Sequence, residues 1–204
     1  MSARGGPLAG LKVVSLAEQY PGPYATLLMA DLGAEVILVE RPGGGDPARQ
    51  FPAFHEALNR NKRAVEIDLK SGAGRDALRG LLRDADVMLE GFRPGTMARL
   101  GFGWDAVSAL NPRLVLVSIS GFGQDGPYRD RPAHDLSYQA MAGLLFAQAR
   151  SGVPLPAGEL AIGDLSAAMF AHQAGLKLVR VPYKGGSAAA TDLLSGQISM
   201  MFEM

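Results

Sequence analysis

Short apolar runs recur along the chain, separated by polar and turn-forming residues. Runs of this length are typical of buried strands when turn residues bound them. The strands that they predict are Leu11–Leu16, Glu35–Glu40, Arg63–Asp68, Val87–Glu90 and Leu114–Ser120.

Segments between these runs carry helical patterns. Tyr24–Leu32 is predicted as a helix, because Pro23 precedes it and Gly33 follows it, as is common at helix starts and ends. Ser71 is the predicted N-cap of a second helix. Apolar residues recur on one face of that helix, namely Leu78, Leu81, Leu82 and Ala85.

The alternation of strands and helices predicts an α/β fold. We expect an open, mostly parallel, Rossmann-like sheet with helices on both faces. In such sheets ligands bind at the carboxyl ends of the strands, so chemistry-bearing residues just after each strand are the first candidates for a site.

Composition narrows the possible partners. The chain has 204 residues, of which 48% are hydrophobic, and this fits a globular domain with a real core. The formal net charge is zero, so neither nucleic acid nor an anionic membrane is expected as a partner. No run has the length of a membrane span and the first ten residues lack an apolar stretch, which predicts a cytoplasmic protein.

Several kinds of site are not supported by the residues present. The chain has no cysteine, which excludes disulfides and thiolate chemistry. Its three histidines are far apart and show no metal-binding spacing, so we expect no metal. No Walker sequence occurs.

Ionisable residues stand at the start of two apolar, helix-like runs. His134 and Asp135 open the first run, and Asp164 opens the second after a glycine. Such positions can hold a base, an acid or a nucleophile in a partly dry site. The alternative is that Asp135 and Asp164 are ordinary helix N-caps and that His134 only positions a loop.

Six motifs in succession resemble the family III CoA-transferases. They are DLGAEVILVERPGGGDPAR, NKRAVEIDLKSGAGR, EGFRPGTMARLGF, NPRLVLVSISGFGQDGPY, AHDLSYQAMAGLL and AIGDLSAAMFA. The family includes formyl-CoA:oxalate CoA-transferase, carnitine CoA-transferase and the 2-methylacyl-CoA racemases. The resemblance covers about residues 7–171 and implies the large domain of such an enzyme without its second domain. It also implies homodimers, and acyl-CoA and carboxylic acid substrates.

The resemblance implies a site for coenzyme A, whose phosphates need cations and main-chain N–H groups. The positions that match the CoA contacts of the family are Gln19, Tyr20, Arg41, Ile67, Lys70, Phe92 and Arg99. Four of them, Arg41, Lys70, Phe92 and Arg99, directly follow or lie close behind predicted strands. The alternative for each Arg or Lys is a solvated surface charge.

Asp164 matches the catalytic aspartate of the transferases. The resemblance implies that its carboxylate attacks an acyl-CoA thioester and forms an acyl-aspartyl anhydride. His134 matches instead a histidine of the racemases, which use it with the later aspartate as two bases. The racemases' asparagine before that aspartate is replaced here by Leu160, so transferase and racemase both remain open, as does an inactive truncated remnant.

The end of the chain departs from this pattern. From about residue 175 the VPYKG and TDLLSGQ runs resemble the solute-binding receptors of tripartite tricarboxylate transporters. This resemblance divides the chain into residues 1–171, the transferase-like domain, and residues 172–204, a foreign-looking tail. A carboxylate-binding receptor is a further alternative, although the expected export signal is not seen.

Overall fold

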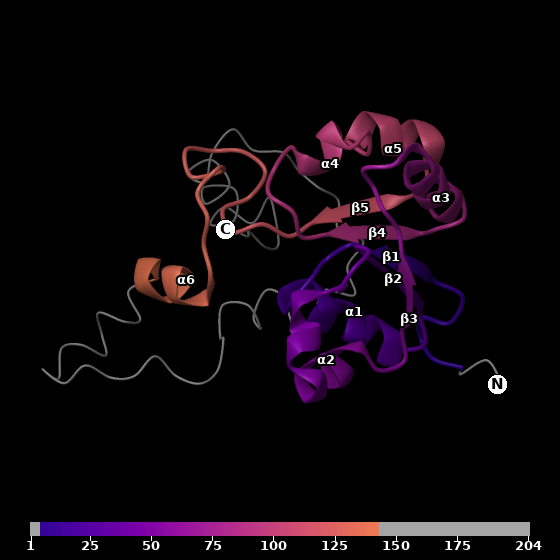
Figure 1. Ribbon diagram of the computed structural model, residues 1–204, viewed down its shortest axis with the longest axis horizontal. Helices are drawn as coiled ribbons and strands as arrows, with labels where there is room; N and C mark the ends of the chain where they lie inside the picture. Colours follow the sequence, from indigo (N-terminus) through magenta and orange to yellow (C-terminus); the bar gives the residue numbers. More distant parts are fainter. Residues whose placement is uncertain (1–4, 143–204) are drawn as a thin grey trace, which may run out of the picture.

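Five parallel strands form the centre of the computed structural model, which describes residues 5–142 (Figure 1). The strands are β1 (Lys12–Ser15), β2 (Glu35–Glu40), β3 (Arg63–Glu66), β4 (Val87–Glu90) and β5 (Val115–Ser118). The helices are α1 (Pro21–Asp31), η1 (Pro47–Gln50), α2 (Pro52–Asn59), α3 (Gly72–Arg83), α4 (Thr96–Arg99), α5 (Trp104–Leu110) and α6 (Asp135–Met141).

The strand order is β3-β2-β1-β4-β5, and every neighbouring pair is parallel. Strands β2 and β3 follow β1 on one side of it, and the chain then crosses over to place β4 and β5 on its other side. The predicted α/β fold with a parallel, Rossmann-like sheet is therefore confirmed. The strand order therefore reverses between β1 and β4, and in open sheets of this type ligands bind at the point of reversal.

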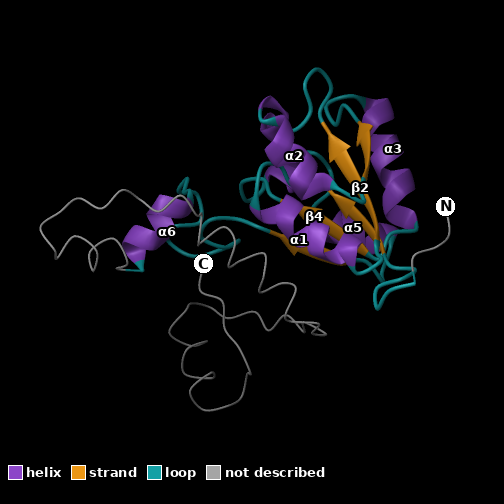
Figure 2. Cartoon of the chain, turned by 90° about the horizontal axis from the view of Figure 1, so that it is seen from below, coloured by secondary structure: helices purple, strands orange, loops and turns teal. Residues whose placement is uncertain are grey.

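Helices cover both faces of the sheet. Figure 1 shows α1 and α2 below the strands and α3, α4 and α5 above them, and Figure 2 shows α2 and α3 on opposite sides. On the α3 side, Leu78, Leu82 and Met88 are fully buried in the main core cluster. On the α1 side, Ala30 packs with Val13 in a second cluster.

Helices α1 and α3 form where the sequence predicts them, although their ends differ slightly from the prediction. The Ser71 hydroxyl accepts a hydrogen bond from the Gly74 N–H at 2.9 Å, which makes it the N-cap of α3. Helix α1 begins at Pro21, earlier than predicted, because two prolines fit its first turn, where no N–H partner is needed. The predicted N-cap role of Asp135 is wrong: His134 is the N-cap of α6 and Asp135 is its first residue.

The two outer strands of the described sheet are more exposed than the central ones. All four residues of β3 are exposed, and Val115 at the start of β5 is 53% exposed. Between residues 5 and 142 we find no helix with the length and apolar character needed to cross a membrane.

Candidate functional site

Because all five strands are parallel, their carboxyl ends lie along the same side of the sheet, which we call its carboxyl edge. The loop after β1 holds Gln19 and Tyr20, and Arg41 directly follows β2. The remaining predicted contacts follow β3 and β4, namely Ile67, Lys70, Phe92 and Arg99. The fold thus brings the seven predicted CoA contacts to one edge, although they come from four separate loops.

The loop after β1 is held by an aspartate from the loop after β2. The Gln19 N–H donates to both carboxylate oxygens of Asp46, at 3.1 Å and 3.0 Å. Asp46 is 5% exposed and also caps η1, where its Oδ1 accepts from the Ala48 N–H at 2.8 Å. Sequence reasoning missed Asp46, because its role depends on a contact across 27 positions.

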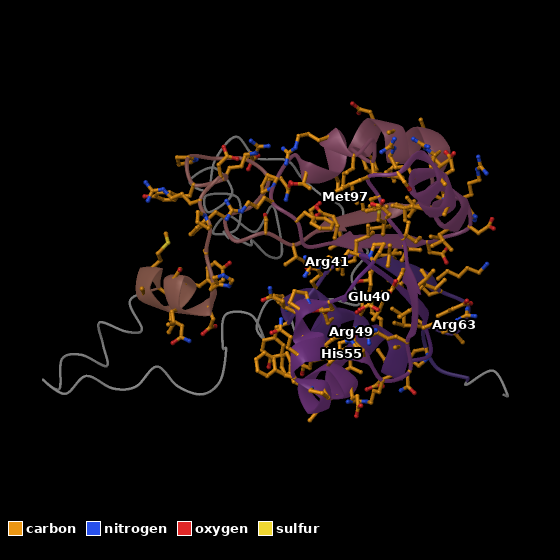
Figure 3. All side chains as sticks on the ribbon, viewed as in Figure 1. Glu40, Arg41, Arg49, His55, Arg63 and Met97 are labelled. Carbon is orange, nitrogen blue, oxygen red and sulfur yellow. The ribbon has the colours of Figure 1, made fainter. Side chains whose placement is uncertain are left out.

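An ion pair between buried Glu40 and the partly exposed Arg49 supports this aspartate (Figure 3). Glu40 is 6% exposed, and its carboxylate accepts from Arg49 Nε at 2.9 Å and from Arg49 Nη2 at 2.6 Å. These hydrogen bonds hold the pKa of Glu40 below its usual range, against the opposing effect of burial. Glu40 Oε1 also accepts from the Asp46 N–H at 3.0 Å.

Arg41 is largely exposed at the end of β2. Its Nε donates to the Gly45 carbonyl at 3.0 Å and lies 3.8 Å from a carboxylate oxygen of Glu18. Burial raises the pKa of Glu18, although the positive charge of Arg41 lowers it in part. The Arg41 side chain is 62% exposed, so its guanidinium group is accessible to an anionic ligand.

The contacts predicted after β3 and β4 differ in accessibility. The Ile67 side chain is 7% exposed and packs in the main core, and its N–H donates to the Glu40 carbonyl. Lys70 is exposed in the turn that precedes α3. Phe92 is half-buried against the same core, and its N–H donates to Oε2 of Glu90 at 2.7 Å.

Two guanidinium groups converge on the turn after β4. A methyl group added at Gly95 would lie 3.5 Å from Arg99 Nη1 and 3.4 Å from Arg129 Nη2. Gly95 has a φ of +81°, a conformation that favours glycine and leaves open the space between the arginines. Two guanidinium groups that lie close to the same point suit a phosphate, because each can donate two hydrogen bonds.

Arg129 was not predicted as a site residue. It follows the loop after β5, so the rule that selected the other candidates, a cation behind a strand, would have found it. Its Nε donates to the Gln124 carbonyl at 2.9 Å, and its Nη1 lies 3.3 Å from Asp130. These contacts fix the guanidinium group beside Gly95.

His134 lies apart from this edge, at the start of α6 (Figure 1). It is exposed, its carbonyl accepts from the Ser137 N–H at 2.7 Å, and Asp135 accepts a hydrogen bond from Gln139. Asp164, the predicted nucleophile, lies outside the described residues, and so do Leu160 and the predicted tail. The proposed pairing of His134 with Asp164 therefore stays a prediction.

A hollow along α2 is lined by none of the predicted contacts. It has a volume of about 400 Å³ and is lined by Arg49, Pro52, His55, Glu56, Asn59 and Arg60. Within residues 5–142 there is no group of three or more His, Asp or Glu side chains placed to hold a metal ion.

Comparison with known families places these features in context. Residues 8–202 match CoA-transferase family III. The chain is similar to an acyl-CoA transferase of Fusarium pseudograminearum, at 36% identity over 98% of this chain and 48% of that protein. It is also similar to a succinyl-CoA–D-citramalate CoA-transferase of Chloroflexus aurantiacus, at 36% identity over 97% of this chain and 52% of that protein. The human succinyl-CoA:glutarate CoA-transferase is 32% identical over 96% of this chain and 47% of its own length.

Solved structures show the same similarity. A hypothetical protein from Mycobacterium tuberculosis is 33% identical, with a TM-score of 0.74 over 95% of this chain and 52% of that one. A CAIB/BAIF family protein from Brucella suis is 31% identical, with a TM-score of 0.73 over 95% of this chain and 51% of that one. The chain spans about half the length of the curated relatives it matches.

The family match also bears on the end of the chain. Because it runs to residue 202, the resemblance of residues 175–204 to a transporter receptor is not supported. The predicted boundary between residues 171 and 172 stays a prediction.

Proposed function

Because the chain belongs to CoA-transferase family III, we propose that it forms the CoA-binding part of an enzyme that moves CoA between an acyl-CoA and a carboxylic acid. The observation that carries this proposal is the convergence of Arg99 and Arg129 on Gly95 at the carboxyl edge of the sheet. Phosphate groups are bound by such hydrogen-bond donors, and several relatives are named as CoA-transferases.

We propose that the remaining predicted residues contact different parts of CoA. Arg41 and Lys70 are exposed cations behind β2 and β3, and they supply charge for the other phosphate groups of CoA. Phe92 and Tyr20 supply apolar surface at the same edge. Ile67 contributes through its main chain, since its side chain is packed in the core.

The chemical step is proposed for Asp164. Its carboxylate oxygen attacks the thioester carbonyl, and the C–S bond breaks to leave an acyl-aspartyl anhydride and CoA thiolate. The thiolate then attacks the aspartyl carbonyl and releases the donor acid. The acceptor carboxylate displaces CoA from that aspartyl thioester, and the thiolate attacks the acceptor's carbonyl carbon, which restores Asp164 and gives the new acyl-CoA.

One observation favours a second candidate function. His134 is exposed at the start of α6, at the position that matches the histidine of the racemases. In a 2-methylacyl-CoA racemase it would remove the α-proton while Asp164 returns one from the opposite face. We also propose, from the family resemblance alone, that the enzyme works in the cytoplasm as a homodimer.

Calorimetry with CoA and with 3′-dephospho-CoA tests the binding proposal. We expect Arg99→Ala and Arg129→Ala each to weaken CoA binding by about tenfold, the effect of losing one charge-assisted contact of roughly 1.4 kcal/mol. Arg113→Ala, which removes an exposed arginine before β5 at the opposite edge, is the control. A folded wild-type chain that gives no heat at millimolar CoA would overturn the proposal.

Two measurements distinguish the transferase reaction from the racemase reaction. A transferase should leave an acyl group on Asp164 that hydroxylamine converts into a hydroxamate, and Asp164→Ala should abolish it. A racemase should instead incorporate deuterium at the α-carbon of a 2-methylacyl-CoA in D₂O, and His134→Ala should stop that exchange.

A further inference from the structure

The loop after β1 holds a residue in an unfavourable backbone conformation. Among residues 5–142, Gln19 and Asn61 are the non-glycine residues with a positive φ, at 66° and 65°. Asparagine tolerates this region, whereas a glutamine is strained there because its Cβ lies too close to the following carbonyl oxygen. Gln19 lies next to the reversal point of the sheet, so its conformation sets the course of a loop where a ligand is expected.

The Asp46 carboxylate offsets this strain. Both of its oxygens lie within hydrogen-bond distance of the Gln19 N–H, at 3.1 Å and 3.0 Å. A carboxylate that accepts from a main-chain N–H in a buried setting makes a stronger hydrogen bond than a neutral oxygen does. The same side chain holds the Ala48 N–H, so it connects the loop after β1 to the loop after β2.

Asp46 does not face a ligand directly. It is 5% exposed, and its own N–H is held by Glu40, which is in turn held by Arg49 through two hydrogen bonds. The Gly45 carbonyl, one residue before Asp46, accepts from Arg41 Nε. Asp46 is therefore connected to two of the loops that carry predicted CoA contacts.

We propose that Asp46 is a positioning residue, which fixes Gln19 in its left-handed conformation and holds the loops after β1 and β2 in register before CoA binds. The inference rests on the proposed function, since it assigns the preorganisation of that same site. It concerns a side chain that acts through Gln19 and Arg41 and does not touch the ligand. Preorganised loops bind more tightly because less ordering remains to be done on binding.

The central variant is Asp46→Asn in the full chain. Asparagine keeps the shape, but it has no negative charge, and its NH2 group replaces one of the two oxygens that accept from the Gln19 N–H and so places a donor beside a donor. We expect CoA affinity to fall by about tenfold, as for loss of a charge-assisted hydrogen bond. We also expect the Gln19 amide to exchange with solvent about tenfold faster in hydrogen-exchange NMR, which needs no ligand.

Asp86→Asn is the matched control. The Asp86 carboxylate accepts from the Lys12 N–H at 2.9 Å, so it makes the same kind of contact at the opposite edge of the sheet. It should leave CoA affinity and Gln19 exchange as in the wild type. Asp46→Ser is the second variant, for use if Asp46→Asn does not fold, because serine keeps an N-cap oxygen for η1 but is too short for Gln19.

A double-mutant cycle separates positioning from a merely structural role. Glycine adopts a positive φ freely, so in a Gln19→Gly background the loss caused by Asp46→Asn should shrink to less than about half. Equal losses in both backgrounds, or unchanged CoA affinity in Asp46→Asn, would overturn the inference. Absence of CoA binding by the wild type would instead overturn the proposed function, while the exchange of the Gln19 amide still tests the contact itself.

Discussion

The Lys62 ammonium group donates a hydrogen bond to the main-chain carbonyl of Pro23 at 2.6 Å, across 39 positions of the chain. It also donates to Asn59 Oδ1 at 2.9 Å, so it ties the connection between α2 and β3 to the first turn of α1. Burial lowers the pKa of Lys62 to about 7, although Asp46 and Asp31 partly oppose this. The positive charge of Lys62 therefore destabilises the folded state.

The first prediction concerns this destabilisation. Below pH 7 both folded and unfolded chains bind the Lys62 proton, whereas between pH 7 and 10.5 the unfolded chain binds a proton that the folded chain has lost. The free energy of unfolding should therefore rise with pH in that window, with a slope of up to about 1.4 kcal/mol per pH unit from this group. Urea unfolding at several pH values should show a shallower slope for Lys62→Met.

Lys12→Met serves as the control for the loss of one positive charge, since Lys12 is exposed at the start of β1. Identical slopes for the wild type and Lys62→Met would show that the lysine is well solvated.

The second prediction concerns Glu90, which is 4% exposed at the end of β4. Burial raises its pKa, while hydrogen bonds from Ser118 and the Phe92 N–H lower it in part. Above pH 4.5 the folded chain holds this proton more tightly than the unfolded one, so stability falls as pH rises through the raised pKa. Glu90→Gln should be more stable than the wild type at pH 7, and the difference should vanish towards pH 4.5.

Chemical unfolding at pH 4.5 and pH 7 measures that difference. A Glu90→Gln variant that is less stable at both values would show that the carboxylate is stabilising as an anion.

The third prediction separates strain from binding at Gly95. Gly95→Ala places a side chain at a φ of +81°, which should cost roughly 1–2 kcal/mol of stability, and places its methyl group between Arg99 and Arg129. Gly101→Ala carries the same strain at a φ of +87°, away from the two arginines. Both variants should melt earlier, but only Gly95→Ala should lose CoA affinity in calorimetry. Equal CoA affinities for the two variants would remove Gly95 from the site.

The fourth prediction concerns Asn111, which is 5% exposed. Its Nδ2 donates to the carbonyls of Leu82 and Ala85 at 3.0 Å and 2.8 Å, just where α3 ends. Asn111→Ala should cost about 2 kcal/mol, because buried carbonyls lose their partner. Asn111→Asp keeps the shape without the donor and should cost at least as much in thermal unfolding. A smaller loss for Asn111→Asp than for Asn111→Ala would mean that the donor is not what matters.

Strands β1, β2, β4 and β5 were predictable because each contains a short apolar run between turn residues, and α3 was predictable because Ser71 caps a regular apolar face. Strand β3 has only Ala64 and Val65 as apolar residues, and all four of its residues are exposed. Helix α2 lacks such a face: Leu58 is its buried residue, while Phe54 is 40% exposed. Its contacts are with other parts of the chain, such as that of the Phe54 ring with the Tyr20 ring, and a local sequence pattern does not show contacts of this kind.

Arg41 and Lys70 could be predicted from their positions, because cations that directly follow parallel strands lie at the same end of the sheet. Gln19, Tyr20 and Ile67 are not cations, and their prediction came from the family resemblance. Asp46 was not predicted because its partner Gln19 lies in a different loop, and a contact of this kind is visible only after the chain has folded.

The strand order has a consequence for the order in which the chain assembles. Strands β1, β2 and β3 lie within residues 12–66, so they emerge from the ribosome and can pair before β4 has emerged. During that interval the second edge of β1, which later receives Val87–Leu89, has no partner. An unpaired edge on the central strand is open to pairing with another nascent chain, and emergence of the segment up to residue 90 closes it. A translational pause that holds β4 inside the ribosome after β3 has emerged should therefore favour aggregation more than a pause that occurs after β4 has emerged.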